Sequence, residues 1–171
     1  VAMSLDSKTL GDVVITSTIA VARKTPVAVS NVMMDYIEEK MGTQEFPEIL
    51  KATPGVHANK EGGGYGDSEI YMRGFDNTNT ATVINGVPVN DPESHAVFFV
   101  NLPDLASSIE NIQIQRGIGT SSNGAAAFGA SINIKTNDRS QEAFSNLNSS
   151  IGSFNTFKNT LSFGTGTNSK G

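Results

Sequence analysis

The 171-residue sequence predicts a mixed α+β domain of short strands and short helices, followed by a β-hairpin near the C-terminus. Apolar and polar residues alternate over several short segments, and Asn85-Gly86 between two β-branched runs is the strongest short signal for a hairpin. Glycine contributes 17 residues and charged side chains only 17% of the chain, which favours strands and turns over long helices. We therefore expect one domain with additional segments at both ends.

The N-terminal residues predict an extended segment and a first strand. Residues 1–11 are polar without a period, and the β-branched run Asp12–Thr16 follows them. Val27, Val29 and Val32 predict a strand that starts after Pro26. This N-terminus has neither a basic nor an apolar region of the secretory type, so we expect any secretory signal to have been removed already.

Two short helices are expected next. Apolar residues at i, i+3 and i+7 from Met34 share one helical face, and Gly42 ends the helix. A second helix is expected to follow, with Phe46, Ile49 and Leu50 on one face, and Thr53-Pro54-Gly55 ends it. The acidic side chains between Asp35 and Glu48 are expected to form the solvated face of both helices.

The middle of the sequence predicts a sheet. Residues 59–68 are typical of a glycine-rich loop, and the alternation around Ile70 predicts a strand. Ala81–Ile84 and Val87–Val89 flank Asn85-Gly86, a dipeptide suited to the two positive φ angles of a type I′ turn. Further elements are a long loop over 90–102, a helical turn over 103–108, and strands over 109–116 and 132–134.

The last part of the sequence predicts two strands of about 10 residues each, apolar on one face and polar on the other. Such alternation is the signature of a transmembrane β-hairpin, and equally of an ordinary half-buried hairpin. The apolar faces carry Ala143, Leu147 and Ile151 in the first strand and Phe157, Leu161 and Phe163 in the second.

Composition and motifs exclude several classes of function. A net charge of −5 argues against nucleic acid as the main partner, and the absence of Cys removes disulfides, thiolate zinc sites and Cys nucleophiles. No apolar run is long enough for a transmembrane helix. The glycine-rich segments lack the spacing of phosphate-binding loops.

Two catalytic alternatives have weak support. Gly66-Asp67-Ser68 resembles the nucleophile block of GDS-type lipases, but the required Asp-x-x-His is absent. Asp91, Glu93 and His95 offer metal ligands on one loop, although a solvated polar loop explains them equally well. We expect no enzyme activity, no catalytic residues, no cofactor and no metal.

Three blocks of sequence, in order, resemble the plug domain of TonB-dependent outer-membrane receptors. Ile70–Phe75 is similar to the family's strand followed by Arg-Gly-aromatic, and Thr82–Asp91 to its hydrophobic strand with a Gly-Val-Pro hairpin. Ser108–Gly117, followed by Phe128-Gly129 and Ile132–Ile134, is similar to the third block. The departures are modest: Ile118, Phe128 and Ala130 stand where the family has Pro, Tyr and Gly.

The resemblance implies a mixed α/β (α+β) plug inside a barrel of about 22 strands, for which this chain is too short. It divides the chain into an N-terminal extended segment (1–24), a plug (25–138) and the first two barrel strands (139–171). In that context the C-terminal hairpin is a transmembrane one. Without the rest of the barrel, its open edges predict that it stays off the plug core and exchanges strands between neighbouring molecules.

The family also implies a function and partners. The chain would close the pore of an outer-membrane active transporter for iron chelates, haem, cobalamin or glycans, with its N-terminus in the periplasm of a Gram-negative cell. TonB, the energy-transducing partner, would pair with a TonB-box-like segment formed by Asp12, Val13, Val14, Ile15 and Thr16, within Asp12–Ser17.

Other residues receive roles from the resemblance or from their loops. Arg73 and Arg116 match arginines that face glutamates of the barrel wall in the family, so they would latch the plug. Their positions also predict that both end strands of one sheet, on one side of the plug. The loops 59–67 and 90–101 would face the ligand through Tyr65, His95, Phe98 and Phe99. The alternative is a soluble periplasmic carbohydrate-binding or hydrolase domain.

Overall fold

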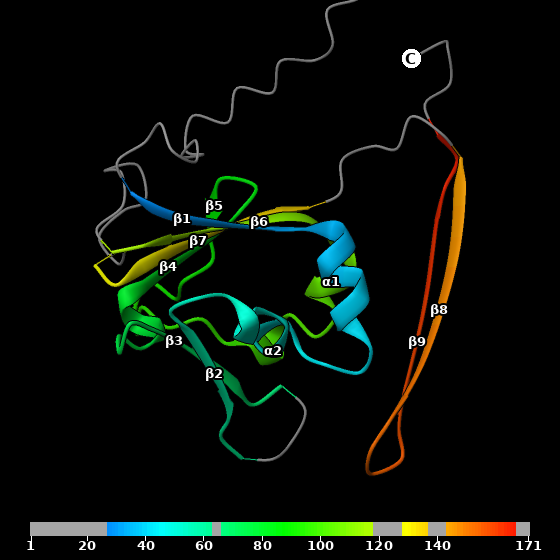
Figure 1. Ribbon diagram of the computed structural model, residues 1–171, viewed down its shortest axis with the longest axis horizontal. Coiled ribbons are helices and arrows are strands. Elements are labelled where there is room, and N and C mark those ends of the chain that lie inside the picture. The colour runs from blue at the N-terminus through cyan, green and yellow to red at the C-terminus, as the bar shows by residue number, and fades with distance from the viewer. Residues whose placement is uncertain (1–26, 63–65, 118–127, 137–142, 167–171) are drawn as a thin grey trace, which may run out of the picture.

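The computed structural model describes residues 27–62, 66–117, 128–136 and 143–166 (Figure 1). Its centre is a five-stranded mixed sheet in the order β1-β6-β7-β4-β5. The β4–β7 pair is parallel and the other pairs are antiparallel. The strands are β1 (Ala28–Met33), β4 (Thr80–Ile84), β5 (Val87–Pro88), β6 (Ile109–Arg116) and β7 (Ala130–Thr136).

Short helices cover one face of this sheet (Figure 1). The two α-helices are α1 (Met34–Met41) and α2 (Phe46–Ile49), in agreement with the predicted helices. Within the described ranges, no helix is both long and apolar enough to cross a membrane. The 3₁₀ turns are η1 (Leu50–Ala52), η2 (Asn77–Asn79), η3 (Phe99–Asn101) and η4 (Leu105–Ser108).

The core lies between the sheet and the helices. Ile112 and Ile114 of β6 are fully buried, as expected for alternate residues that share one face of a central strand. Ile37 of α1 and Ile49 of α2 are buried in the same cluster. The short helices and strands between residues 27 and 136 bury these side chains together, and this burial is the main source of the stability of the domain.

A second sheet was not predicted in full. It is a two-stranded antiparallel ribbon of β2 (Val56–Lys60) and β3 (Ser68–Met72), which lies beyond α2 from the main sheet (Figure 1). The expected loop over 59–68 is therefore shorter than predicted. In β2 only Val56 and Ala58 are buried, so the strand lacks a sustained apolar alternation.

The Asn85-Gly86 turn has the predicted geometry. Asn85 has φ 50° and Gly86 has φ 85°, the positive values that a type I′ turn requires. The Asn85 side chain also donates to Thr136 Oγ1 at 2.7 Å and accepts from the Thr136 amide at 3.0 Å. These contacts tie the turn to the end of β7.

The C-terminal hairpin consists of β8 (Phe144–Gly152) and β9 (Thr156–Gly164) and stands beside α1 (Figure 1). Its apolar side chains point away from the plug, with Ile151 77% and Phe163 74% exposed. The polar residues on the other face, among them Ser150 and Thr160, are partly buried. The hairpin contacts the plug through its polar face, as in the pair of Lys158 with Asp104, but its apolar side chains are not part of the plug core, as expected. Strand exchange between neighbouring molecules stays a prediction.

Candidate functional site

A cleft of about 190 Å³ opens where two predicted ligand-facing loops meet. Gly66–Glu69, at the start of β3, forms the first wall, and Val97–Val100, around the start of η3, forms the second. Asn77 of η2 completes the lining and donates to the carbonyl oxygen of Val97 at 3.4 Å. The cleft thus combines backbone, carboxylate, amide and aromatic groups.

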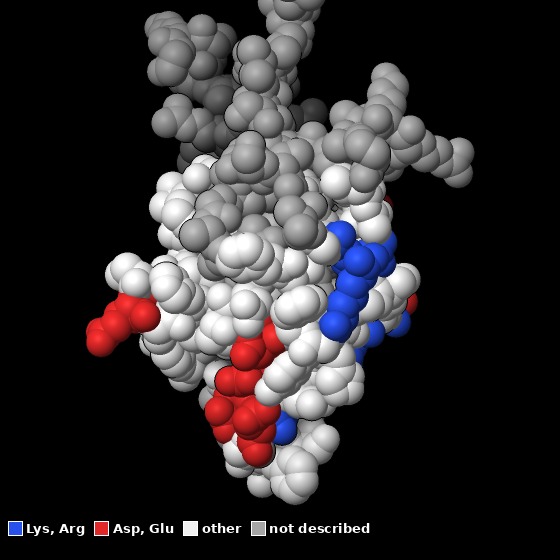
Figure 2. Space-filling view, turned by 90° about the vertical axis from the view of Figure 1, so that its left-hand side faces the viewer, with Lys and Arg blue, Asp and Glu red and all other residues white. Residues whose placement is uncertain are grey.

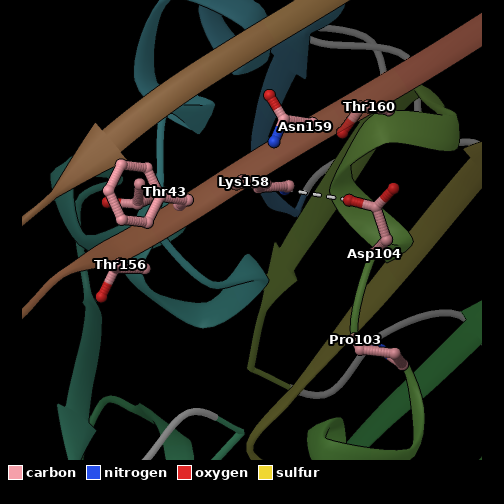
Figure 3. Close-up of a pocket in the computed structure, with 8 residues that line it drawn as sticks. Thr43, Pro103, Asp104, Thr156, Lys158, Asn159 and Thr160 are labelled. Carbon is pink, nitrogen blue, oxygen red and sulfur yellow. Dashed lines mark ion pairs between the residues drawn. The ribbon is translucent and has the colours of Figure 1, made fainter.

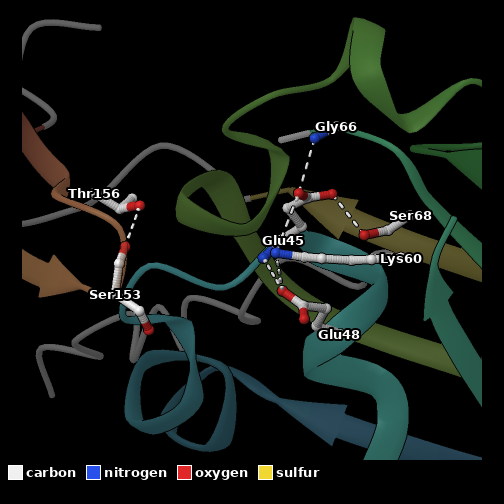
Figure 4. Close-up of polar contacts among 7 residues, drawn as sticks. All are labelled: Glu45, Glu48, Lys60, Gly66, Ser68, Ser153 and Thr156. Atoms are coloured by element: carbon white, nitrogen blue, oxygen red, sulfur yellow. Dashed lines mark hydrogen bonds and ion pairs between the residues drawn. The ribbon is translucent and has the colours of Figure 1, made fainter. Parts of the chain in front are cut away.

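The first wall is fixed by a buried carboxylate (Figure 4). Glu45, the residue before α2, is 5% exposed and accepts from the Gly66 amide at 2.8 Å and from Ser68 Oγ at 2.7 Å. Lys60 lies 3.7 Å from Glu45 and 3.4 Å from Glu48, which supplies a counter-charge. The expectation that the acidic residues of this region form a solvated face is wrong for Glu45.

The second wall contains two adjacent phenylalanines, of which one side chain is exposed and the other is buried. Phe98 is 52% exposed, whereas Phe99 is 6% exposed and packs on Phe46 with 5.5 Å between ring centroids. The expectation that Phe99 faces outward is wrong, since η3 begins at this residue and turns its side chain into the core. Of the two, Phe98 offers the larger aromatic surface to a ligand.

The loop that carries His95 is compact. Asp91 Oδ1 accepts from the amides of Glu93 at 2.6 Å and Ser94 at 3.1 Å, which holds the pKa of the Asp91 carboxyl below its usual range. His95 is exposed, has φ 59°, and donates its amide to the Asp91 carbonyl at 2.8 Å. Within the described ranges, no group of three or more His, Asp or Glu side chains is placed to hold a metal ion.

The suspected hydrolase serine has a structural role. Ser68 is 4% exposed and its hydroxyl donates to the Glu45 carboxylate, so the hydroxyl is buried and is bonded to a carboxylate where a nucleophilic serine would have a histidine base. This burial argues against the GDS-type alternative.

The outer face of the β2–β3 ribbon is acidic. Tyr71 Oη lies 3.0 Å from a carboxylate oxygen of Glu61 and 2.9 Å from one of Glu69. Hydrogen bonding to Glu69 and then to Glu61 raises the pKa of Tyr71 to about 12, because a phenolate beside two carboxylates is disfavoured. His57 faces Tyr71 across the ribbon, with 6.5 Å between ring centroids.

The two candidate latch arginines meet over Gly55. A Cβ atom at Gly55 would lie 3.2 Å from Arg116 Cδ and 3.8 Å from Arg73 Cγ, so both side chains pack against this glycine. Their strands belong to different sheets, since Arg73 follows β3 and Arg116 ends β6. The premise of one shared sheet is therefore wrong, although the two side chains are neighbours.

Their hydrogen bonding leaves donors for a further partner. Arg116 Nη1 donates to the Pro54 carbonyl at 2.6 Å, and its Nε has no hydrogen-bond partner in the part of the chain that the structure describes. Arg73 is exposed, and its amide donates to the Gly55 carbonyl at 3.1 Å. The face seen from the left of Figure 1 shows a strip of basic side chains above a group of acidic ones (Figure 2).

An ion pair joins the plug to the hairpin (Figure 3). Lys158 Nζ of β9 lies 2.9 Å from Asp104 Oδ1, just before η4, and the Lys158 side chain is only 17% exposed. A cavity of about 580 Å³ lies at this seam, lined by residues 156–160 of β9 and by Thr43, Pro103 and Asp104 of the plug. A Cβ at Gly152 would lie 2.7 Å from Thr43 Oγ1, which shows how closely the hairpin approaches.

Two sets of predicted site residues lie outside the described residues: Tyr65, and the TonB-box-like segment Asp12, Val13, Val14, Ile15 and Thr16. The structure brings Phe98 to the cleft and Arg73 beside Arg116, whereas His95, on the same loop as Phe98, does not line the cleft. The role of Glu45 was not predicted from the sequence. The pattern that could have indicated it is Glu-x-x-Glu at the start of the short helix, a spacing typical of a capping box.

A mixed sheet with two loops at a cleft, beside a hairpin with its apolar face outward, is the arrangement that the resemblance to a plug domain with barrel strands implies. The model of the TonB-dependent receptor plug domain matches residues 21–131, and the chain belongs to this family.

Curated relatives include vitamin B12 transporters. The chain is 33% identical over 98 residues to vitamin B12 transporter BtuB of Vibrio vulnificus strain YJ016, a match that covers 57% of this chain and 16% of that protein. It is 26% identical over 133 residues to BtuB of Vibrio cholerae strain M66-2, covering 78% of this chain and 21% of the relative. The chain thus matches about a fifth or less of the relatives' length.

Solved structures show the same fold. The ferripyoverdine receptor of the Pseudomonas aeruginosa outer membrane superposes with a TM-score of 0.67 at 18% identity, covering 91% of this chain and 20% of that chain. The ferric yersiniabactin uptake receptor FyuA of Yersinia pestis gives a TM-score of 0.60 at 16% identity, covering 80% of this chain and 21% of that chain. The predicted fold class, a plug with partial barrel strands, is confirmed.

Proposed function

We propose that this chain is the pore-closing part of an outer-membrane active transporter of a Gram-negative cell, and that TonB moves it to admit a scarce nutrient. The observation that carries the proposal is the orientation of the hairpin beside a plug of the matching family. Its apolar face points away from the plug and its polar face toward it, the arrangement expected for barrel wall between lipid and plug.

The proposed ligand is a cobalamin or a ferric siderophore. Relatives at 33% and 26% identity carry the name vitamin B12 transporter, and the structures of similar fold are siderophore receptors. In this chain the ligand would contact the cleft between Gly66–Glu69 and Val97–Val100, where Phe98 offers apolar surface. Tyr65 and His95 would contact it from the adjoining loops. Neither a cofactor nor a catalytic step enters this function.

Arg73 and Arg116 are the proposed latch to the barrel wall. The methylene carbons of both arginines pack on one glycine, and the Arg116 Nε lacks a partner among the described residues, an arrangement that suits a carboxylate supplied from outside the plug. Such a carboxylate would compensate the buried Nε, which is costly when unpaired.

The segment Asp12–Ser17 is the proposed attachment point for TonB. A β-branched run suits addition as a strand to an edge of the partner, where backbone hydrogen bonds give the affinity. The coupling segment is predicted to transmit force without contacting the nutrient.

Deletion of residues 12–17 from the whole receptor tests the proposal. Uptake of radiolabelled cyanocobalamin should be abolished, while equilibrium binding to outer-membrane fractions should remain nearly intact. A deletion of equal length at residues 2–7 serves as the control and should leave both values unchanged. Equal loss of binding and uptake in the first deletion would contradict the coupling role.

A further inference from the structure

Two consecutive residues at the start of α2 hold both walls of the cleft. Glu45 accepts hydrogen bonds from Gly66 and Ser68 of the first wall, on its Oε1 and Oε2 atoms respectively. Phe46 packs against Phe99 of the second wall. The start of α2 therefore contacts both walls, although neither Glu45 nor Phe46 lines the cleft.

The two walls touch at Gly66. This residue has φ 91°, and a Cβ there would lie 2.8 Å from Val100 Cγ2 and 3.2 Å from Val100 Cα. Because the contact leaves no room for a side chain, a small shift of Gly66 changes the width of the cleft directly. The hydrogen bond from the Gly66 amide to Glu45 opposes such a shift.

The geometry requires a carboxylate at position 45. Two donors from the first wall reach different oxygens, and Lys60 adds a positive charge 3.7 Å away. A glutamine has one acceptor oxygen and no charge, so it satisfies only part of this arrangement. Glu48 completes the capping box and pairs with Lys60 at 3.4 Å, whereas Gly66 and Ser68 both donate to Glu45.

We propose that Glu45 is a positioning residue for ligand binding: its carboxylate holds Gly66 and Ser68 at the width that admits the ligand. The inference rests on the proposed binding role of the cleft. It assigns Glu45 an effect on affinity without any contact to the ligand, and it predicts little effect on the movement of the plug.

The first arm of the test needs no ligand. The 171 residues contain no Cys, so Asp67→Cys gives one labelling site in this chain once any cysteine elsewhere in the receptor is replaced. Asp67 is an exposed residue of the first wall itself. A nitroxide at this position in the whole receptor should gain mobility in E45Q and remain unchanged in E48Q, the matched control. Identical spectra for wild type and E45Q would overturn the proposal.

The second arm measures binding and uptake of cyanocobalamin. E45Q should raise the dissociation constant about tenfold, as expected for loss of one charge-assisted hydrogen bond, and leave the uptake rate at saturating cyanocobalamin unchanged. E48Q should keep the wild-type constant. A fall in the saturating rate with an unchanged dissociation constant would show a merely structural role and contradict the proposal.

The two arms separate the inference from the proposed function. Should the wild-type receptor not bind cyanocobalamin, the proposed substrate fails, and the nitroxide spectra still decide whether Glu45 positions the wall. S68A covers the case in which E45Q does not fold, because it removes one donor and leaves the carboxylate in place. S68A should increase the mobility of the nitroxide at position 67 less than E45Q does. An unchanged spectrum in S68A would count against the proposal.

Discussion

The sheet of the plug and the β8–β9 hairpin share an alternating sequence pattern but present it to opposite surroundings. In β6, Ile112 and Ile114 are fully buried against the helices. In the hairpin, Leu147 is 72% and Ile151 77% exposed, while the polar face is partly buried against the plug. Alternation therefore defines a two-faced strand, and the environment decides which face is covered.

The plug and the hairpin obtain their stability from different sources. The plug buries its own apolar surface, so its stability is internal to residues 27–136. The hairpin contacts the plug by polar groups such as Lys158, and an isolated two-stranded hairpin is marginal in water. Its apolar face needs a second apolar phase, which the proposed outer membrane supplies.

The largest expected effect on the free energy of unfolding comes from truncating an isoleucine of an alternating strand, and it should differ between the two regions. Ile114→Ala should lower the free energy of unfolding of the plug by about 2–5 kcal/mol, since it opens a cavity in a packed core. Ile151→Ala should change it by less than about 0.5 kcal/mol, because that side chain is exposed. Both changes in free energy can be measured by urea unfolding of the 171-residue chain, monitored through hydrogen exchange of the β6 amides. Equal losses would mean that the hairpin's apolar face is packed within the chain.

Substitutions in the turns of the two regions should change stability in opposite directions. Asn85→Ala removes the contacts to Thr136 and places alanine at φ 50°, so it should cost about 1 kcal/mol or more in plug stability. Phe154 is fully exposed at φ 56°, where a bulky side chain is strained. Phe154→Gly should relieve that strain by about 1 kcal/mol and increase amide protection in β8 and β9.

Asn85→Gly is the control for the first turn. It keeps the positive φ and loses only the side-chain contacts, so it should cost less than Asn85→Ala. A larger cost for glycine would show that backbone strain is not the reason for asparagine at this position.

The smallest effect is expected at the seam between the regions. The Asp104–Lys158 pair is partly exposed on the aspartate side, at 46%, so its coupling energy should be about 1 kcal/mol or less. A double-mutant cycle with Asp104→Asn and Lys158→Met measures it through the protection of β9 amides. A coupling energy of zero would show that the hairpin is not held against η4 by this pair.

Local signals in the sequence were sufficient for much of the fold. The Asn85-Gly86 turn, α1 and the strand around Ile132 follow from turn chemistry and periodicity. The parallel pairing of β4 with β7 has no local signal, because it joins residues about fifty positions apart through tertiary contacts. The ribbon strand β2 was missed because it buries only two side chains.

The site was less predictable than the fold. Phe98 and Phe99 are chemically identical neighbours, and only the start of η3 decides which one is buried. Glu45 lies among acidic residues, so composition suggested a solvated helix face. Its burial depends on Gly66 and Ser68, which approach it only through the tertiary fold.

We propose that the hairpin is barrel wall, with lipid on one side and the plug on the other. Single nitroxides at Ser150, Ile151, Thr160 and Leu161 of the whole receptor in bilayers, with oxygen collision rates from power saturation, test it most directly. Barrel wall in this orientation should give high oxygen access at Ile151 and Leu161 and low access at Ser150 and Thr160. Equal access at adjacent positions, or the opposite phase, would contradict it.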